Sequence, residues 1–299
     1  MYVGIDFLWD GRRDLYISEV NTGLPAGATE YDLVYRQKFG RSSEIFEKIQ
    51  SLSRQAYNLD FPDYIAGLPW LEDLRLLKIW MDEKGPFPED PHPFLKLEDK
   101  WIQYMLLKNG FPMIPTLLLS GLKKWTDIPS EWKKVVLKKR LGRGGRGLSF
   151  LDRSTEPEGL PLPSDSYLVQ PLLHSRLGTR AFSVRAAAFA GRYLCMFASL
   201  GPLHYSNHGT RFYVSPGDKL RFSSPTFRTK IIEQKSWEAD LFYGGRIPEY
   251  LHHNTHIEQI ADTDLVIPHE HFTVIQKIAA SISAFYMNLK FEDLSENLN

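Results

Sequence analysis

The chain has little cysteine, no net charge and no long apolar run. Its single cysteine, Cys195, excludes an internal disulfide framework and is expected to be a small buried thiol. The 36 basic and 36 acidic residues cancel, so no overall field favours nucleic acid or an anionic membrane as a partner. No apolar run approaches the roughly 18–20 residues that cross a bilayer, and the residues after Met1 lack the pattern of a signal peptide. We therefore expect a cytoplasmic protein.

A length of 299 residues is enough for one large domain or two smaller ones. Apolar patterning predicts strands at 2–8, 15–20, 135–138, 148–151, 167–170, 182–189 and 192–199, with hairpin turns at 10–11 and 190–191. Helical spacing of apolar residues covers 32–57, 70–81, 97–109 and 268–289. Four prolines within residues 85–93 make the clearest break. Strands and helices in this order predict an α+β fold.

The strongest local chemical signal is a glycine-rich segment between two predicted strands. Gly142, Gly144 and Gly147 match a G-x-G-x-x-G spacing, and Lys138 ends the strand before them. A dinucleotide-binding loop of this pattern leads into a helix, whereas a strand is expected here at 148–151. Glycine lets backbone amides approach phosphate oxygens closely, so one prediction is a phosphate-binding hairpin with Lys138 beside it. The other interpretation is a basic surface hairpin or an RGG-like patch for RNA.

A second signal lies in the first predicted hairpin, which carries two carboxylates and an amide. Glu19 and Asn21 are two residues apart on a strand and therefore point to the same face. Asp6, on the partner strand, is expected to face that pair across the hairpin. Two carboxylates and an amide oxygen make a hard oxygen site of the kind that Mg²⁺ prefers. The other interpretation is the polar face of an exposed hairpin, but the apolar neighbours Ile5 and Ile17 argue for burial, where an unpaired carboxylate is costly.

Asp6, in Val-Gly-Ile-Asp-Phe, and the later Glu-Val-Asn at 19–21 resemble the metal-binding end of ATP-grasp ligases. Ribosomal-protein glutamate ligases and D-alanine–D-alanine ligase are members of that family. Four further segments match the family in kind and in spacing. They are Asp99–Lys100 with Gly-Phe-Pro-Met-Ile-Pro-Thr at 110–116, the glycine hairpin at 135–151, Leu-Val-Gln-Pro-Leu at 168–172, and Gly-Thr-Arg-Ala-Phe-Ser-Val-Arg at 178–185.

The resemblance implies a role for each matched residue. The metal ligands would be Asp6, Glu19 and Asn21, and Lys138 and Arg185 would act in catalysis by offsetting charge on the phosphates. The nucleotide contacts would be Lys100, Lys138, Gly142, Gly144, Gly145, Gly147, Gln170, Pro171, Leu172 and Arg185. ATP and Mg²⁺ are thus the implied ligands.

The order of the matched segments differs from that of the family, in which the metal hairpin comes last. The resemblance therefore implies a circularly permuted ATP-grasp fold of two α+β lobes with an added helical segment, because a fold tolerates a cut at an exposed turn. The expected parts are a metal hairpin of the C-terminal lobe at 1–31, the helical segment at 32–96, an N-lobe with the phosphate loop at 97–170 and the C-lobe at 171–299. Met1 and Asn299 would then be close in space. Alternatively, the hairpin completes the site of a neighbouring subunit.

The family implies a ligase that activates a carboxylate as an acylphosphate for attack by an amine or a thiol, releasing ADP and phosphate. Its partners would be a small-molecule or peptide carboxylate and a nucleophilic acceptor, with the chain a monomer or homodimer. The alternatives are an ATP-grasp small-molecule kinase and a non-catalytic nucleotide-binding or interaction protein. No Asp or Glu lies between Pro171 and Arg185 to hold the ribose, which leaves the nucleotide preference open. Five histidines between 252 and 271 lack the spacing of a standard zinc site, and we expect them to be solvated.

Overall fold

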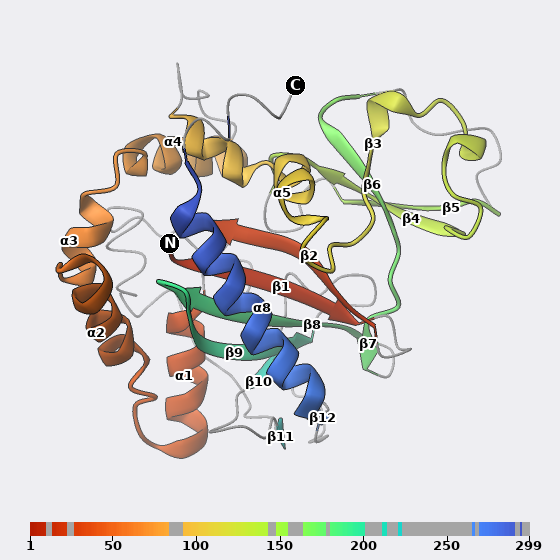
Figure 1. Cartoon of the computed structure of the whole chain (residues 1–299). Helices are drawn as coiled ribbons and strands as arrows, with labels where there is room; N and C mark the ends of the chain where they lie inside the picture. The colour runs from red at the N-terminus through yellow and green to blue at the C-terminus, as the bar shows by residue number, and fades with distance from the viewer. Residues whose placement is uncertain are drawn as a thin grey trace.

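The computed structural model of the chain has an α+β fold built on antiparallel sheets (Figure 1). It describes residues 1–9, 14–22, 27–83, 92–142, 148–154, 164–177, 180–200, 211–213, 221–222, 265–266, 269–290 and 294. The hairpin turn predicted at 10–11, the proline-rich break up to residue 91, and Asn299 lie outside these residues. Within the described part of the chain, no helix is long and apolar enough to cross a membrane.

The larger sheet joins the start of the chain to its middle. Its strands are β10 (Arg211–Tyr213), β9 (Arg192–Leu200), β8 (Arg180–Phe189), β1 (Val3–Trp9) and β2 (Leu15–Thr22), in that order, with β7 (Arg176–Leu177) pairing β8. The predicted strands at 2–8, 15–20, 182–189 and 192–199 are confirmed within one or two residues. β1 pairs with β8 of the same chain, from Val3 opposite Ala188 to Phe7 opposite Val184. The N-terminal hairpin is therefore an integral part of this sheet.

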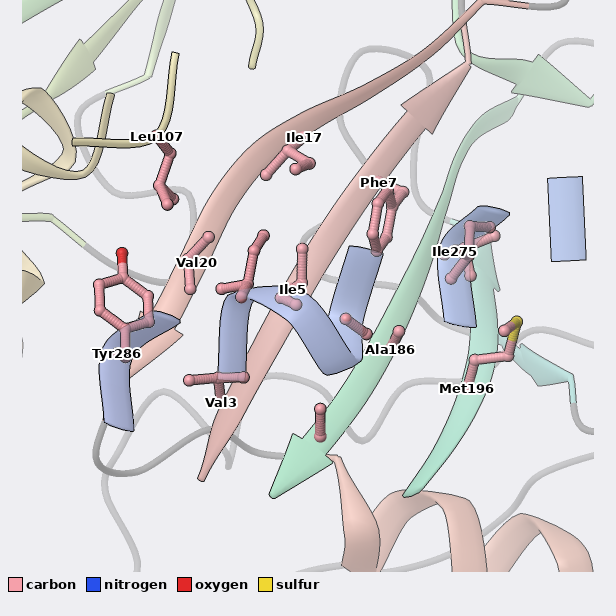
Figure 2. Packing of buried hydrophobic residues seen from close by; sticks show 14 of the residues in the cluster. Val3, Ile5, Phe7, Ile17, Val20, Leu107, Ala186, Met196, Ile275 and Tyr286 are labelled. Atoms are coloured by element: carbon pink, nitrogen blue, oxygen red, sulfur yellow. The ribbon is translucent and has the colours of Figure 1, made fainter. Parts of the chain in front are cut away.

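One face of the larger sheet packs against a long helix, α8 (His269–Asn288), which crosses it in Figure 1. The predicted helix at 268–289 is confirmed. Figure 2 shows Val3, Ile5 and Phe7 of β1 turned toward Ile275 and Tyr286 of α8. Each of these side chains is buried, and full burial of a large apolar side chain contributes about 1.5–3 kcal/mol. Because side chains alternate along a strand, Tyr2, Gly4 and Asp6 face the opposite side of the sheet.

Four helices lie against or beside the opposite face. They are α1 (Ala28–Phe39), α2 (Ile45–Tyr57), α3 (Phe61–Ala66) and α4 (Leu71–Glu83). The helical stretch predicted at 32–57 is confirmed as two helices rather than one: Gly40 ends α1 with a positive φ of 68°, and Glu44 also has a positive φ, of 59°, before α2. α3 was not predicted, while α4 matches the helix expected at 70–81. Tyr2, Ile49, Phe61 and Phe189 share the apolar core on this side, and Cys195 is buried in it as expected.

The smaller sheet has the strand order β3 (Leu117–Leu118), β6 (Tyr167–Pro171), β4 (Lys134–Lys139) and β5 (Ser149–Asp152). Its apolar face carries Val135, Leu137 and Val169 and packs on two short 3₁₀ turns, η2 (Leu119–Gly121) and η3 (Trp125–Asp127). β4 and β5 are antiparallel neighbours across the glycine loop. A strand therefore follows the loop, which confirms that the segment is not a dinucleotide-binding strand–loop–helix unit.

The two sheets are connected through η1 (Pro93–Glu98) and α5 (Lys100–Leu107). A helix over 97–109 was expected, but α5 begins only at Lys100, because the Asp99 side chain accepts a hydrogen bond from the Trp101 N–H at 2.8 Å and caps the helix. The remaining pairing joins β11 (Arg221–Phe222) to β12 (Leu265–Val266).

Candidate functional site

A bulge in β2 decides which side chains of the first hairpin face the helices α1–α4 and which face α8. Asp6 is opposite Glu19 and Phe7 is opposite Ile17, so no residue of β1 lies opposite Ser18 in the register. This extra residue lets Ile17 enter the α8 core while Glu19 turns to the face that carries Asp6. Asn21, two residues after Glu19, lies on the same face. The three predicted metal ligands are thus together on one face of the sheet.

Asp6 and Arg185 form a two-point ion pair across the β1–β8 ladder. The Arg185 Nε donates to Asp6 Oδ1 at 2.6 Å, and its Nη2 donates to Oδ2 at 2.7 Å. Asp6 is only 3% exposed, so this carboxylate has little solvent to stabilise its charge. A bidentate guanidinium replaces that solvation and fixes the orientation of both groups.

The edge of β2 away from β1 is bridged at Ile17 by Met113 and is held further along by the helix that carries Lys100. Gln103 accepts a hydrogen bond from the Val20 N–H at 3.1 Å and donates from Nε2 to the Val20 carbonyl at 2.6 Å. Gln103 is one helical turn after Lys100, so the two side chains project from the same side of α5. Lys100 therefore lies beside β2, with its Nζ 3.8 Å from Glu19 Oε2 and both side chains largely buried.

Lys138, on β4 of the smaller sheet, also lies near the carboxylates of the first hairpin. On β4, Val135 and Leu137 point into the apolar core, so Lys138 points to the other face. Burial is the largest influence on its ammonium group and lowers the pKa of Lys138. The carboxylates of Glu19 and Asp6 act in the opposite direction, and Lys100 adds to the lowering. Lys138, from mid-chain, therefore lies within electrostatic range of the N-terminal hairpin.

Lys100 also contacts the beginning of the glycine loop. Its Nζ donates to the Gly142 carbonyl, and its backbone N–H donates to the Arg140 carbonyl at 3.2 Å. Gly142 is thus beside the predicted phosphate-binding lysine. The other predicted loop contacts, Gly144, Gly145 and Gly147, lie outside the described residues.

The predicted base-binding segment follows directly on β6. Gln170 is 6% exposed and lies opposite Val136, on the face of the sheet that also carries Lys138. Its Nε2 donates to Thr116 Oγ1 at 2.9 Å, which leaves its buried Oε1 as an acceptor without a partner among the described residues. An unpaired buried acceptor is costly unless a ligand supplies a donor.

At the end of β6, neither Pro171 nor Leu172 has a backbone N–H that is available to a ligand. Pro171 has no N–H, and the Leu172 N–H already donates to the Lys134 carbonyl at 2.9 Å. Among the described residues, Leu173 has the first backbone N–H after Pro171 for which no hydrogen bond is found. The contact expected at Leu172 stays a prediction, and the Leu173 N–H is a further candidate contact that the sequence resemblance did not name.

The predicted Mg²⁺ ligands fit an oxygen site in number and kind. In the described part of the chain, no three or more His, Cys, Asp or Glu side chains lie together in a group that could hold a metal. The predicted ligand set does not form such a group, because only two of its three members, Asp6 and Glu19, are carboxylates. Asn21 supplies the third group through its amide oxygen, and its buried Nδ2 has no hydrogen-bond partner among the described residues. Asp6 retains acceptor capacity beyond the Arg185 contacts, because a carboxylate accepts about four hydrogen bonds or metal bonds.

The assembled site has a charge that suits a metal–polyphosphate. Its carboxylates are Asp6 and Glu19, and its cations are Lys100, Lys138 and Arg185; two negative charges against three positive charges leave a net charge of +1. The chain as a whole has a net charge of zero, so this positive charge is local. Cations at fixed positions in a poorly solvated site are suited to binding and polarising phosphate oxygens.

No protein-family model matches the chain, and no curated protein sequence matches it.

Proposed function

We propose that the chain binds Mg-ATP where the two sheets approach each other, and uses it to activate a carboxylate for ligation. The observation that carries the proposal is the meeting of two distant segments. The Lys100 Nζ lies 3.8 Å from Glu19 Oε2 of the acidic β1–β2 hairpin and donates to the Gly142 carbonyl at the glycine loop. The carboxylates of the same hairpin also raise the pKa of Lys138, on β4. Carboxylates for a metal and lysines for phosphates are the two halves of a phosphoryl-transfer site.

The arrangement also supports an ATP-grasp fold of two lobes. In this proposal the smaller sheet, with the glycine hairpin, is the N-lobe, and the larger sheet is the C-lobe. The pairing of β1 with β8 of the same chain supports a permuted order in which the N-terminal hairpin takes the role of the family's metal hairpin. In this proposal the permuted order needs no second subunit.

Each residue has a role that follows from its contacts. Lys100 and Lys138 offset charge on the phosphates, and Lys138, being half-buried, does so in surroundings less polar than water, where a charge acts more strongly. Asp6, Glu19 and Asn21 would hold Mg²⁺, which when bound neutralises phosphate charge. Arg185, fixed by Asp6, stabilises charge that develops on the oxygen atoms during transfer.

In the proposed reaction, an oxygen of the substrate carboxylate attacks the γ-phosphorus, the bond to the bridging oxygen breaks, and ADP leaves. An amine or thiol then attacks the acyl carbon, loses a proton and displaces phosphate. Positioning and charge neutralisation supply most of the catalysis in such a transfer.

The base-binding end of the site supports adenine. Because Gln170 Nε2 is held by Thr116, its Oε1 is presented as an acceptor and favours a base with an amino group. The backbone N–H of Leu173 favours a base with a ring-nitrogen acceptor beside that amino group. Adenine has both groups on one edge.

The test is to trap the activated carboxylate. The protein is incubated with Mg-ATP, hydroxylamine and a panel of amino acids and small carboxylic acids, and hydroxamate and ADP are measured together. The proposal predicts Mg²⁺-dependent ADP release matched by hydroxamate for at least one acid. Lys138→Met should abolish both products. Release of AMP and pyrophosphate would contradict the proposed chemistry.

The same assay separates the two alternatives, which share the nucleotide site. ADP release with a stable phosphorylated alcohol and no hydroxamate identifies a small-molecule kinase. Tight Mg-ATP binding without ADP formation over the whole panel identifies a nucleotide-binding protein without catalysis.

A further inference from the structure

An ion pair outside the proposed contact set joins the base of the glycine loop to the helix that carries Lys100. Arg140 directly follows β4, and Asp99 directly precedes α5. The Arg140 Nε lies 2.9 Å from Asp99 Oδ2 and 3.1 Å from Oδ1, and its Nη2 lies 2.6 Å from Oδ2. Asp99 is buried, and most of the Arg140 side chain is covered as well. This is a bidentate pair with a defined geometry rather than a solvated surface contact.

Backbone hydrogen bonds fix the same two segments to each other. The Lys100 N–H donates to the Arg140 carbonyl at 3.2 Å, and the Arg140 N–H donates to the Ser166 carbonyl at 2.9 Å. Arg140 therefore links α5 on one side to the beginning of β6 on the other. Two residues later in the chain, the Gly142 carbonyl accepts from Lys100 Nζ.

Asp99 carries out two tasks with one carboxylate. Its Oδ1 accepts from the Trp101 N–H and so sets where α5 begins, while its oxygens also bind Arg140. The position of Lys100, the first residue of α5, thus depends on the position of Arg140, the residue after the strand of Lys138. A displacement of either segment would alter the spacing between the two lysines.

We propose that the Asp99–Arg140 pair is a positioning device that holds Lys100 in register with Lys138 and Gly142 for binding the ATP phosphates. This inference rests on the proposed function, since the phosphates are those of the proposed nucleotide. In this proposal the pair acts on nucleotide binding through Lys100 rather than by direct contact. Its contribution is preorganisation: two lysines held at a fixed spacing lose less freedom when a ligand binds.

Conservative substitutions can break the Asp99–Arg140 pair with little other change to the structure. Asp99→Asn keeps an N-cap residue for α5, because Asn caps helices as well as Asp, but it removes the charge that Arg140 binds. Arg140→Gln removes the other partner, and Arg140→Lys keeps the charge without the bidentate geometry. The matched control is Asp152→Asn, which breaks the Lys134–Asp152 pair at 2.9 Å in the same small sheet, away from α5.

Two measurements test the proposal. In the absence of ATP, hydrogen exchange at the Lys100 and Arg140 amides should be faster in Asp99→Asn and Arg140→Gln, and unchanged in Asp152→Asn. In steady state, both pair variants should raise the KM for ATP roughly tenfold with kcat changed by less than about twofold, as expected for lost ground-state and transition-state binding together. Arg140→Lys should restore part of the affinity.

The outcomes separate this proposal from the proposed function. If the wild-type protein does not bind Mg-ATP, the proposed function fails, whatever the variants do. If the wild type binds and the pair variants have an unchanged KM, the positioning role is overturned. A loss of activity that follows only a lower Tm, with no change in KM in the folded fraction, overturns it as well.

Discussion

Asp6 and Arg185 are 179 positions apart in the chain, yet their side chains form two hydrogen bonds of 2.6 and 2.7 Å. The pair joins the first strand to a strand from the second half of the sequence and lies on the sheet face that also carries Glu19. It has two consequences. It makes Asp6 part of the fold as well as part of the proposed metal site, and it fixes Arg185 at the place where phosphate charge is expected.

Breaking this pair on one side should destabilise the protein. Asp6→Asn or Arg185→Met alone leaves its partner poorly solvated, and we expect a loss of at most about 3 kcal/mol, the lower end for buried pairs because Arg185 keeps some exposure. Urea denaturation of both single variants and the double variant measures this, and the double variant should be less unstable than the sum. Additive losses would contradict the coupling.

An exposed pair of the same length provides the matched control. Arg54 Nε also lies 2.6 Å from an aspartate oxygen, that of Asp60, but both side chains are largely solvent-exposed. Arg54→Met should therefore have a much smaller effect than Arg185→Met. Because Asp6 has this structural role, loss of activity in its variants does not by itself identify a metal ligand, and Glu19 is the cleaner position to test.

Replacing Lys138 with an uncharged residue should affect the free energy of unfolding and nucleotide binding in opposite directions. Its folded pKa lies below the ordinary value of 10.5, so the folded state disfavours the charged form. This cost is fully present at pH below the folded pKa and is relieved as pH rises from there toward 10.5. Lys138→Met should thus keep or raise the free energy of unfolding at pH 7 while weakening Mg-ATP binding. A variant that loses both equally would contradict this prediction.

The same pKa predicts the pH dependence of nucleotide affinity. Binding of phosphate needs the ammonium form, so the affinity of the free protein for Mg-ATP should fall as pH rises through the lowered pKa of Lys138. Lys138→Arg keeps its charge at these pH values and should remove that alkaline decline. Isothermal titration calorimetry from pH 6 to 10 measures both curves, and identical declines would assign the titration to another group.

Glu19→Gln should change the metal requirement and the pH profile together. It removes a carboxylate from the proposed Mg²⁺ site, so the Mg²⁺ concentration for half-maximal ATP binding should rise by roughly tenfold or more, equivalent to about 1.4 kcal/mol. It also removes a negative charge that raises the pKa of Lys138, so the alkaline decline should move to lower pH. An unchanged Mg²⁺ requirement would remove Glu19 from the metal site.

The link between α5 and β2 can be tested by stability alone. Gln103→Leu leaves the Val20 N–H, the Val20 carbonyl and the Leu97 carbonyl without their buried partner, and we expect a loss on the order of 3 kcal/mol. Gln55→Leu on α2, where the glutamine is exposed, is the control and should change stability little. Equal effects of the two substitutions would show that the α5–β2 bridge adds no stability.

The sequence predicted most of the strands because alternation and β-type residues are local signals. The strands at 135–138 and 167–170 and the helix at 268–289 are found in the structure close to their expected bounds. The turn at 190–191 is also confirmed, with positive φ at Ala190 and Gly191. In each case the segment carries its own apolar face and its own stop signal.

Other features depend on contacts that no local pattern reveals. The bulge at Ser18 is needed to put both Ile17 and Val20 into the α8 core while Glu19 faces the other way, and only the packing of the whole sheet decides this. The Arg140–Asp99 pair joins segments 41 residues apart, so nothing near either residue indicates the other. The break between α1 and α2 is signalled by Gly40, but the apolar spacing on both sides obscured it.

The most direct test of the central claim is the titration of Mg-ATP into the wild-type protein and into Lys138→Met. One ATP per chain should bind to the wild type in a Mg²⁺-dependent manner, and the affinity of a fully folded Lys138→Met variant should be lower by roughly tenfold or more. No binding to the wild type at millimolar ATP, or equal affinity in the two proteins, would contradict it.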